Sequence, residues 1–552
     1  MYLKQLIILI IFLLEFIPDC SQNINAESDF YIRLNQVGFL PDDIKTALVI
    51  SKVKLNSIDA LIKNVKTNKI VFQTALKSLS NGYGNFQYNY LIDFTDLKQE
   101  GEYEILVNKV KSYTFKIGKD IYKDVTLSLL EFFKVQRCGY TNPLLHDVCH
   151  IADATSIIDG KNVINKNIDV TGGWHDAGDY IKFLNTTAFA TYMLLFSYEF
   201  NPEKFSFDNN RNNLPDILEE AKVGLDWLLR CNYEGKKFVT QVQDLKDHES
   251  EWRLPENDKY GFDRPATLGI GKNLIGIYSA TLALASRIWR DKFQYYEFAD
   301  KCLNTARHFY SIRNNVPDVD SSGSGMYLDK EFKGKLALAA IELFITTKNK
   351  KYYEDAISYI DSASNNFWWS WGDINPIVHY KLSIYDKRYS ELLKNNLEEF
   401  NRYKNSNTFG LGTVLNWGSN NTLLGITLQN ILWKKLTGDS YYDTLACLQK
   451  DFILGRNPWG ISFIYGFGKN YSQNFHHQIS YFKKKLPGGF AAGPVPRKLL
   501  NDFKIQFENE DKYSQFQTNE IYYRDDRWDY ITNEPTISAN ATAIFVFGNL
   551  MN

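Results

Sequence analysis

Two aspartates in the segment GGWHDAGDY, residues 172–180, have the spacing of a pair that acts on one water molecule. Asp176 and Asp179 are separated only by an alanine and a glycine, which let the backbone turn tightly enough for both carboxylates to face one space. Because clustered carboxylates repel each other, their proximity suggests a function. One carboxylate can remove a proton from water while the other orients that water. An Asp-Gly turn with a helix N-cap is the alternative, and it requires no chemistry.

A third carboxylate, Glu534, precedes a proline and an apolar helix expected over residues 541–547. Trp528 and Tyr530 lie just before it in the sequence. Such neighbours partly exclude water, which raises the pKa of a carboxyl group and suits it to act as a general acid. The other interpretation is that Glu534 caps the start of the helix. On the residues alone, the capping interpretation is the one to prefer.

Two cysteines and two histidines form a further group: Cys138, Cys149, His150 and His175. These are the ligand types of a tetrahedral zinc site, and a complete set of four indicates a structural metal. Reduced thiols with incidental histidines are an alternative, as is a Cys138–Cys149 disulfide in an oxidising compartment. The adjacent His476 and His477 lie in a loop rich in Gly and Asn, where contact with a ligand and simple surface exposure both remain open.

Composition excludes some partners. The 552 residues include 63 basic and 64 acidic side chains, with a formal net charge of −1. A surface so evenly balanced lacks the positive field that holds nucleic acid, so we expect no nucleic-acid partner. Aromatic residues make up 15% of the chain. Core packing explains most of them, and stacking on sugar rings is a second use for some.

The N-terminus has the anatomy of a secretory signal peptide over residues 1–26. A lysine precedes an apolar run at residues 6–14, which is too short to cross a bilayer. No other stretch is apolar for long enough to form a transmembrane segment, so we expect a secreted protein, extracellular or periplasmic. A lipid anchor at Cys20 is the alternative, disfavoured because Pro18 and Asp19 replace the small residues that processing prefers.

The chain is too long for one ordinary core and should divide into domains. Residues 29–119 contain short β-like runs bounded by turn residues, which predict a small β-sandwich. From residue 122 onward, apolar residues recur at helical spacing in about ten segments, without a strand pattern long enough for a parallel sheet. This pattern predicts a helical bundle or toroid. Its long loops, residues 235–265 and 455–535, are where a site would be built.

Together these segments resemble glycoside hydrolase family 9, the inverting endoglucanases, with the immunoglobulin-like N-terminal module that many members carry. The motifs follow in the family's order: FFKVQRCG, CHIADA, GGWHDAGDY, NWGSNN, ILGRNPWGISFIYGFG and NEPTISANA. The family's C-terminal signature is matched at Tyr523, Asp525, Tyr530, Glu534, Thr536, Asn540 and Ala541. The resemblance implies a multi-domain fold, an all-β immunoglobulin-like sandwich over residues 29–119 followed by an all-α (α/α)6 six-hairpin barrel over residues 122–552.

The resemblance also assigns catalytic roles. It implies that Asp179 is the base that takes a proton from water, that Asp176 holds this water, and that Glu534 is the acid. Asp525 matches a supporting acidic residue, and His476 matches a histidine that hydrogen-bonds the sugar. The implied function is an inverting endo-β-1,4-glucanase on soluble or amorphous β-glucan, xyloglucan included. An exo-acting β-glucosidase, cellobiohydrolase or glucosaminidase on short oligosaccharides is one alternative, and a carbohydrate-binding relative with weakened catalysis is another.

Further contacts follow from the same resemblance. The substrate-binding residues it implies are Trp174, Trp417, His477, Gln478 and Tyr530. Gln478 departs from the family, which usually has arginine at this position. A neutral amide thus replaces a charged guanidinium group, and the substrate subsites are expected to differ. Catalysis needs no cofactor, and the partner is a β-glucan chain bound by a monomer.

Metal binding in the family implies two sites in this chain. Structural zinc would be held by the four Cys and His residues named above. Calcium would be held near the start of the helix that follows Pro215, by Asp216, Glu219 and Glu220.

Overall fold

The structure, a computed structural model, describes residues 28–56, 58–258, 263–323, 327, 329–363 and 369–551. The signal peptide predicted for residues 1–26, with Cys20, lies outside the described residues. In the described part of the chain, no helix combines the length and the apolar character needed to span a membrane.

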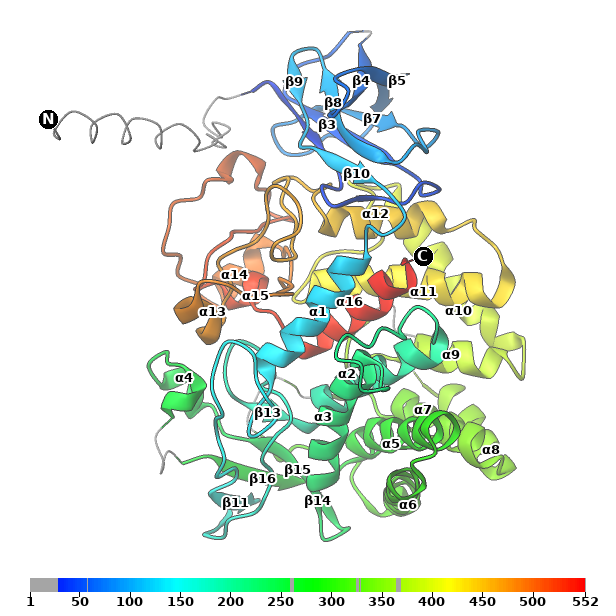
Figure 1. The fold of residues 1–552 in the computed structure, drawn as a ribbon, viewed down its shortest axis with the longest axis vertical. Helices are drawn as coiled ribbons and strands as arrows, with labels where there is room; N and C mark the ends of the chain where they lie inside the picture. Colours follow the sequence, from blue (N-terminus) through cyan, green and yellow to red (C-terminus); the bar gives the residue numbers. More distant parts are fainter. Residues whose placement is uncertain are drawn as a thin grey trace, which may run out of the picture.

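The N-terminal part is a two-sheet β structure (Figure 1). One sheet has the order β1 (Phe30–Arg33), β3 (Thr46–Ser51), β7 (Tyr88–Asp93) and β6 (Lys77–Leu79). The other has the order β2 (Gly38–Phe39), β10 (Phe115–Ile117), β8 (Gly101–Val107), β4 (Asp59–Asn64) and β5 (Ile70–Ala75), with β9 (Val110–Lys111) paired to β8. Strand β8 shows why the sheets pack: Tyr103, Ile105 and Val107 alternate along it and are all buried in the core between the sheets.

Helices make up most of the rest. The longer ones are α1 (Lys123–Gln136), α2 (Leu184–Phe200), α3 (Asp216–Arg230), α5 (Lys272–Phe293), α6 (Tyr296–Ile312), α7 (Lys333–Thr347), α8 (Lys350–Ile360), α9 (Asn375–Ser383), α10 (Arg388–Lys404), α11 (Ser419–Thr437), α12 (Asp443–Ile453) and α16 (Ile537–Asn549). The short ones are α4 (Lys246–Glu249), α13 (Gln478–Lys483), α14 (Arg497–Asp502) and α15 (Tyr530–Asn533), with 3-10 turns at Pro255–Asn257, Arg313–Asn315 and Ser514–Phe516.

The longer helices form two layers. Helices α2, α5, α7, α9, α11 and α16 contact one another in a closed ring. Each packs against one outer helix, respectively α3, α6, α8, α10, α12 and α1. The sequences of the helices explain the two layers. Inner α2 has no charged residue before its last turn and is buried on all sides. Outer α6, in contrast, buries only one stripe, with Ala299, Cys302 and Ala306 at helical spacing along it.

A six-stranded sheet in the helical part was not expected from the sequence. Its order is β12 (Asn162–Ile164), β11 (Ser156–Asp159), β16 (Pro265–Gly269), β15 (Lys237–Val242) and β13 (Lys182–Phe183), with β14 (Asn232–Tyr233) paired to β15. Only β11 and β16 run parallel. Strands this short show too little alternation to be recognised in a sequence. The sheet lies at the end of the molecule opposite the β-sandwich (Figure 1).

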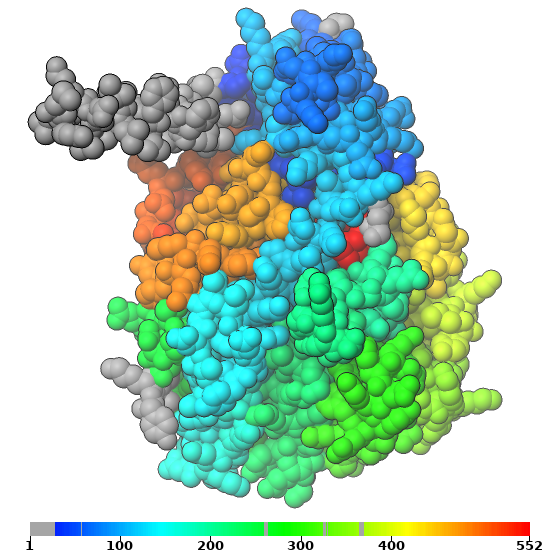
Figure 2. Space-filling model, in the orientation of Figure 1, coloured from blue at the N-terminus to red at the C-terminus, as the bar shows by residue number. Residues whose placement is uncertain are grey.

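The sandwich sits directly on the helical part (Figure 2). Buried polar groups join the two at the loop after β1. The Asn35 amide donates to Asp451 Oδ1 (2.9 Å), and the Lys450 ammonium donates to the same carboxylate (2.9 Å) and to the Tyr122 hydroxyl (2.6 Å). All four side chains are buried, so Lys450 depends on Asp451 for its compensating charge.

Replacing Asp451 by Leu therefore tests this junction. The change leaves the buried Lys450 ammonium with Asp43, 3.5 Å away, as its remaining carboxylate. We expect a loss of about 3 kcal/mol in the free energy of unfolding and a lower midpoint of thermal unfolding, because a buried charge that loses its nearest partner is costly. Asp42→Asn is the control, since Asp42 pairs with Lys98 on the surface and should leave the midpoint unchanged. Equal midpoints for the two variants would contradict the prediction.

Candidate active site and metal sites

The turn at residues 172–180 holds its two aspartates in different surroundings. Asp176 is buried and accepts hydrogen bonds from the Thr186 hydroxyl and from the Tyr327 hydroxyl, the latter at 2.5 Å. Burial raises the pKa of Asp176 to about 6, against these two hydrogen bonds, which favour its ionised form. Asp179 is 14% exposed, and its Oδ1 accepts from the Ile181 N–H at 3.0 Å. Protein donors thus hold both carboxylates, and that of Asp179 is the one with some exposure to solvent.

Gly178 brings distant segments to this turn. A Cβ atom at this position would lie 2.0 Å from the His476 carbonyl oxygen, so no larger residue fits. The Gly178 carbonyl accepts from the Gln478 N–H at 3.0 Å, and its own N–H donates to Glu534 Oε1 at 3.2 Å. The glycine therefore joins three sequence motifs within a few ångströms.

Glu534 lies in extended backbone between α15 and α16. The interpretation that it caps the following helix is wrong, since Thr536 is the N-cap of α16 and accepts from the Ala539 N–H. Burial, followed by the negative charge of Asp179, raises the pKa of Glu534 to about 8. At neutral pH this carboxyl group is therefore mostly protonated and able to donate a proton.

His248 contacts the accessible aspartate and was missed by the sequence analysis. Its Nε2 lies 2.5 Å from Asp179 Oδ2. This hydrogen bond, opposed by burial, raises the pKa of His248 to about 9, so the imidazole is charged at neutral pH and faces the carboxylate. The residue lies on α4, within the long loop of residues 235–265 that was expected to carry a site. A histidine next to an acidic residue in such a loop was the available signal.

The loop before α13 carries His476, as expected. Its Nδ1 lies 2.8 Å from the Arg527 carbonyl oxygen, which can only accept, so Nδ1 carries the proton and Nε2 is left as an acceptor. Burial lowers the pKa of His476 and keeps the ring neutral. Asp525 acts on the same loop, since its Oδ1 accepts from the Gln473 and Asn474 N–H groups at 3.0 and 2.9 Å.

Three of the side chains expected to bind substrate are instead buried against protein groups. Trp174 is fully buried, and its indole N–H donates to Glu220 Oε1 at 2.8 Å. His477 is buried between Gln136 and the Ser480 N–H. Gln478 is also buried. Its amide oxygen accepts from the Arg253 N–H at 3.0 Å. Their contacts are with protein groups, so these three side chains support the structure around the site.

The remaining two expected substrate contacts, Trp417 and Tyr530, lie side by side and partly exposed, with ring centroids 5.9 Å apart. Tyr530 is in turn 5.7 Å from His476. His476 is also 5.2 Å from Trp252, which packs on Trp528 at 5.0 Å. Several aromatic rings thus lie close to the histidine, and partly exposed aromatic rings are suited to stacking on sugar rings.

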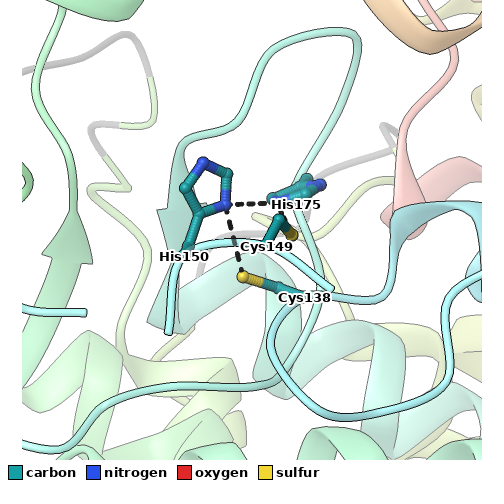
Figure 3. A group of neighbouring side chains, drawn as sticks. All are labelled: Cys138, Cys149, His150 and His175. Carbon is teal, nitrogen blue, oxygen red and sulfur yellow. Dashed lines mark hydrogen bonds between the residues drawn. The ribbon is translucent and has the colours of Figure 1, made fainter. Parts of the chain in front are cut away.

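The Cys and His group converges on one point (Figure 3). His150 Nδ1 lies 3.2 Å from His175 Nε2 and 3.6 Å from Cys138 Sγ, and Cys149 Sγ lies 3.9 Å from His175 Nε2. Zinc bonds of about 2.0 Å to nitrogen and about 2.3 Å to sulfur give tetrahedral edges of about 3.3–3.8 Å, so the donors fit zinc. The adjacent ligands both reach this point because His150 has a left-handed φ of 50°.

The alternative of a disulfide is wrong. Cys138 and Cys149 are free thiols, as are the other cysteines of the described residues, Cys231, Cys302 and Cys447. Burial raises the pKa of each of the last three thiols, which makes them unreactive.

The expected calcium ligands do not converge as a group. The prediction of Glu220 as a calcium ligand is wrong, because its carboxylate accepts a hydrogen bond from Trp174 and forms an ion pair with Arg137 at 2.7 Å. Glu219 instead faces Asn210 and Asn212, whose terminal amides contact it. Asp208 accepts from the backbone N–H groups of residues 212 and 213, and Asn213 has a left-handed φ of 67°.

This loop follows the spacing of an EF-hand. Asp208, Asn210, Asn212, Asp216 and Glu219 occupy the first, third, fifth, ninth and twelfth positions of such a loop. Asn213 stands where the EF-hand has its turn glycine, and its positive φ makes the same turn. Half a turn of either asparagine amide would present an oxygen in place of nitrogen. The donor set is therefore all oxygen, as calcium requires.

Comparison with known proteins gives two family matches. The model of glycosyl hydrolase family 9 matches residues 122–547, and that of the cellulase N-terminal ig-like domain matches residues 27–112. Endoglucanase D of Acetivibrio thermocellus is 26% identical over 534 residues, covering 90% of this chain and 82% of the relative. A cellodextrinase of Butyrivibrio fibrisolvens is 25% identical over 507 residues, covering 84% and 90%. The crystal structure of a metagenome-derived family 9 endoglucanase has the same fold, with a TM-score of 0.81, 24% identity and coverage of 95% and 99%.

The pKa of Glu534 provides a direct test of the site. In the intact protein we expect its carboxyl group to titrate near pH 8, observed by carbon NMR of labelled glutamate. In Asp179→Asn the same titration should move to lower pH, because the charge of Asp179 disfavours ionisation of Glu534. Asp226→Asn on the outer surface of α3 should leave it in place. A titration of Glu534 near the ordinary value for glutamate in the wild type would show that the site is not assembled as described.

Proposed function

Because the chain belongs to glycosyl hydrolase family 9, we propose that it is an endo-acting β-1,4-glucanase that hydrolyses β-glucan with inversion of the anomeric carbon. The observation that carries this proposal is the contrast between Glu534, whose raised pKa keeps it protonated, and the aspartate pair held next to it through Gly178. Paired carboxyl groups of opposite protonation state are what an inverting glycosidase needs.

In the proposed reaction, Asp179 takes a proton from water as the water oxygen forms a bond to the anomeric carbon. Glu534 gives its proton to the glycosidic oxygen as the bond from the anomeric carbon to that oxygen breaks. Asp176 orients the water, since Thr186 and Tyr327 fix its carboxylate. An inverting pair leaves about 6.5–9.5 Å between acid and base so that the water fits.

His248 and His476 complete the proposed site. The charged ring of His248 holds one oxygen of Asp179 through a hydrogen bond. The free Nε2 of His476 accepts a hydrogen bond from a sugar hydroxyl. The aromatic rings near His476 supply stacking surfaces for neighbouring sugars, which favours attack within a chain on soluble or amorphous glucan, xyloglucan included.

A second candidate is exo-acting hydrolysis of short oligosaccharides. The similarity to a protein named cellodextrinase favours it. Product patterns over time separate the two modes, because an endo enzyme first releases mixed oligomers and an exo enzyme releases a single small sugar.

The proposal includes two domains, secretion, a monomeric state and two metal sites. The closed ring of helices with its outer layer supports an (α/α)6 barrel over residues 122–552, preceded by an immunoglobulin-like domain over residues 29–119. The signal peptide at residues 1–26 directs secretion, and the protein acts as a monomer. Structural zinc is held by Cys138, Cys149, His150 and His175. Calcium is held in the EF-hand-like loop of residues 208–219.

The stereochemistry tests the reaction. Proton NMR of the wild type acting on a β-1,4-linked oligosaccharide should show the α-anomer of the new reducing end first, before mutarotation. We expect Asp179→Asn to slow hydrolysis by a factor of about 10²–10⁴, the usual contribution of a general base. Asp169→Asn, near the surface and paired with Arg230, serves as the control and should retain the rate. First appearance of the β-anomer, or equal rates for the two variants, would contradict the proposed mechanism.

Calcium binding is tested by thermal unfolding. Added calcium should raise the unfolding midpoint of the wild type, with a stabilisation of about 2.7 kcal/mol at a hundred times the dissociation constant. Glu219→Gln should lose this response, because it removes the carboxylate at the twelfth loop position. Glu203→Gln, an exposed glutamate just before the loop, should keep it. If the wild type does not respond to calcium, the loop is not a calcium site.

A further inference from the structure

A line of buried ion pairs leads from the proposed zinc site to the active-site loop. It starts at His150, whose Nδ1 faces the other three metal donors while its Nε2 lies 2.8 Å from Asp258 Oδ2. The Asp258 side chain is only 2% exposed and also binds the Arg253 guanidinium, through Nε and through Nη2 at 3.1 Å. Asp258 thus joins a metal ligand to the loop of residues 244–258.

Arg253 continues the line to the helix that carries His248. Its Nη2 donates to Asp247 Oδ1 at 2.6 Å, and the fully buried Asp247 accepts from the Tyr180 N–H at 3.0 Å with its other oxygen. The Tyr180 hydroxyl donates back to the Arg253 carbonyl at 2.5 Å. Asp247 directly precedes His248 on α4, so whatever fixes Asp247 also fixes the histidine that faces Asp179.

Few contacts restrain the side chain of His248. Its side chain is 51% exposed, and its ring forms a hydrogen bond with Asp179. Helix α4 has a single turn, which is too short to be stable by its own hydrogen bonds. The position of His248 therefore depends on the buried anchors on either side of it, Asp247 and Arg253.

A bound metal would define the first link of this line. A metal at His150 Nδ1 leaves the ring proton on Nε2, pointing at Asp258, and prevents the ring from rotating. Carboxylates in this position orient a metal-bound histidine and strengthen its binding. Without the metal, the contacts of Nδ1 with Cys138 and His175 are the remaining polar restraint on that side of the ring, so the donor that faces Asp258 is held less strictly.

We propose that Asp258 and Arg253 are positioning residues that couple metal occupancy at Cys138, Cys149, His150 and His175 to the placement of His248 against Asp179. This inference rests on the proposed function in that it takes the four residues as a zinc site and Asp179 as the base. The metal then does more than brace the fold, because it sets the order of a loop at the catalytic base.

Amide hydrogen exchange of the full-length protein tests the coupling without using activity. In the wild type, removal of zinc by a chelator should speed exchange in residues 244–258, where the His248, Arg253 and Asp258 amides are hydrogen-bonded, while the inner helices keep their protection. Asp258→Asn should show fast exchange in this loop with zinc bound. Glu249→Gln is the matched control, as it removes one negative charge from an exposed position in the same loop.

Two further measurements separate positioning from a merely structural role. Competition with a chelator should show zinc affinity reduced about 10-fold or more in Asp258→Asn and unchanged in Glu249→Gln. With zinc bound, Asp258→Asn should lower kcat about 10-fold or more with little change in KM, and Arg253→Lys should retain part of the rate.

The coupling is overturned if zinc removal leaves exchange in residues 244–258 unchanged in the wild type. It is also overturned if exchange rises equally in the inner helices, since zinc would then stabilise the whole domain and not this line of contacts. Exchange and zinc affinity are both measured without substrate. A protein that shows the coupling but cleaves no glucan would therefore refute the proposed function alone.

Discussion

The close approach of Gly178 to the His476 carbonyl is the constraint on which the active site depends. It leaves no room for a side chain at residue 178, and in return it packs the aspartate turn, the segment before α13 and Glu534 against one another. The chemistry follows from this packing, because the pKa of Glu534 is raised first by burial and then by the charge of Asp179. Neither motif alone would place a carboxyl group of raised pKa next to the aspartate pair.

The same turn is held from two sides. On one side, His175 belongs to the Cys and His group that could hold a metal ion, and on the other the Asp176 carbonyl accepts from the Ile537 N–H at the start of α16 at 3.0 Å. Asp176 and Asp179 therefore extend from a backbone with little freedom, although the turn itself has no regular secondary structure. Rigid supports on both sides are what allow a loop to hold a catalytic group to within a fraction of an ångström.

Long helices and the aspartate pair could be predicted because their signals are local. Apolar spacing within one segment defines α5 or α11, and two carboxylates three residues apart suggest their own chemistry. Glu534 depended on the order of several motifs, since its burial comes from distant segments. His248 was missed for the same reason, as it is 69 residues from Asp179 in sequence.

Trp174 and Gln478 show the reverse error: sequence position places a residue near a site but does not reveal whether its side chain faces the substrate or the core. The short strands β11–β16 carry too few residues for a periodic signal.

The helix that closes the ring has a consequence for how the protein is made. Helix α16 fits between α2 and α11, and Glu534 lies just before it in the sequence. Its contacts with α1 and α2 are among the longest-range in the chain, and such contacts form late because a long stretch of polypeptide must first be ordered. During synthesis the aspartate turn emerges well before Glu534, the proposed acid. Under the proposed mechanism the polypeptide therefore has no hydrolytic activity until α16 has closed the ring of helices.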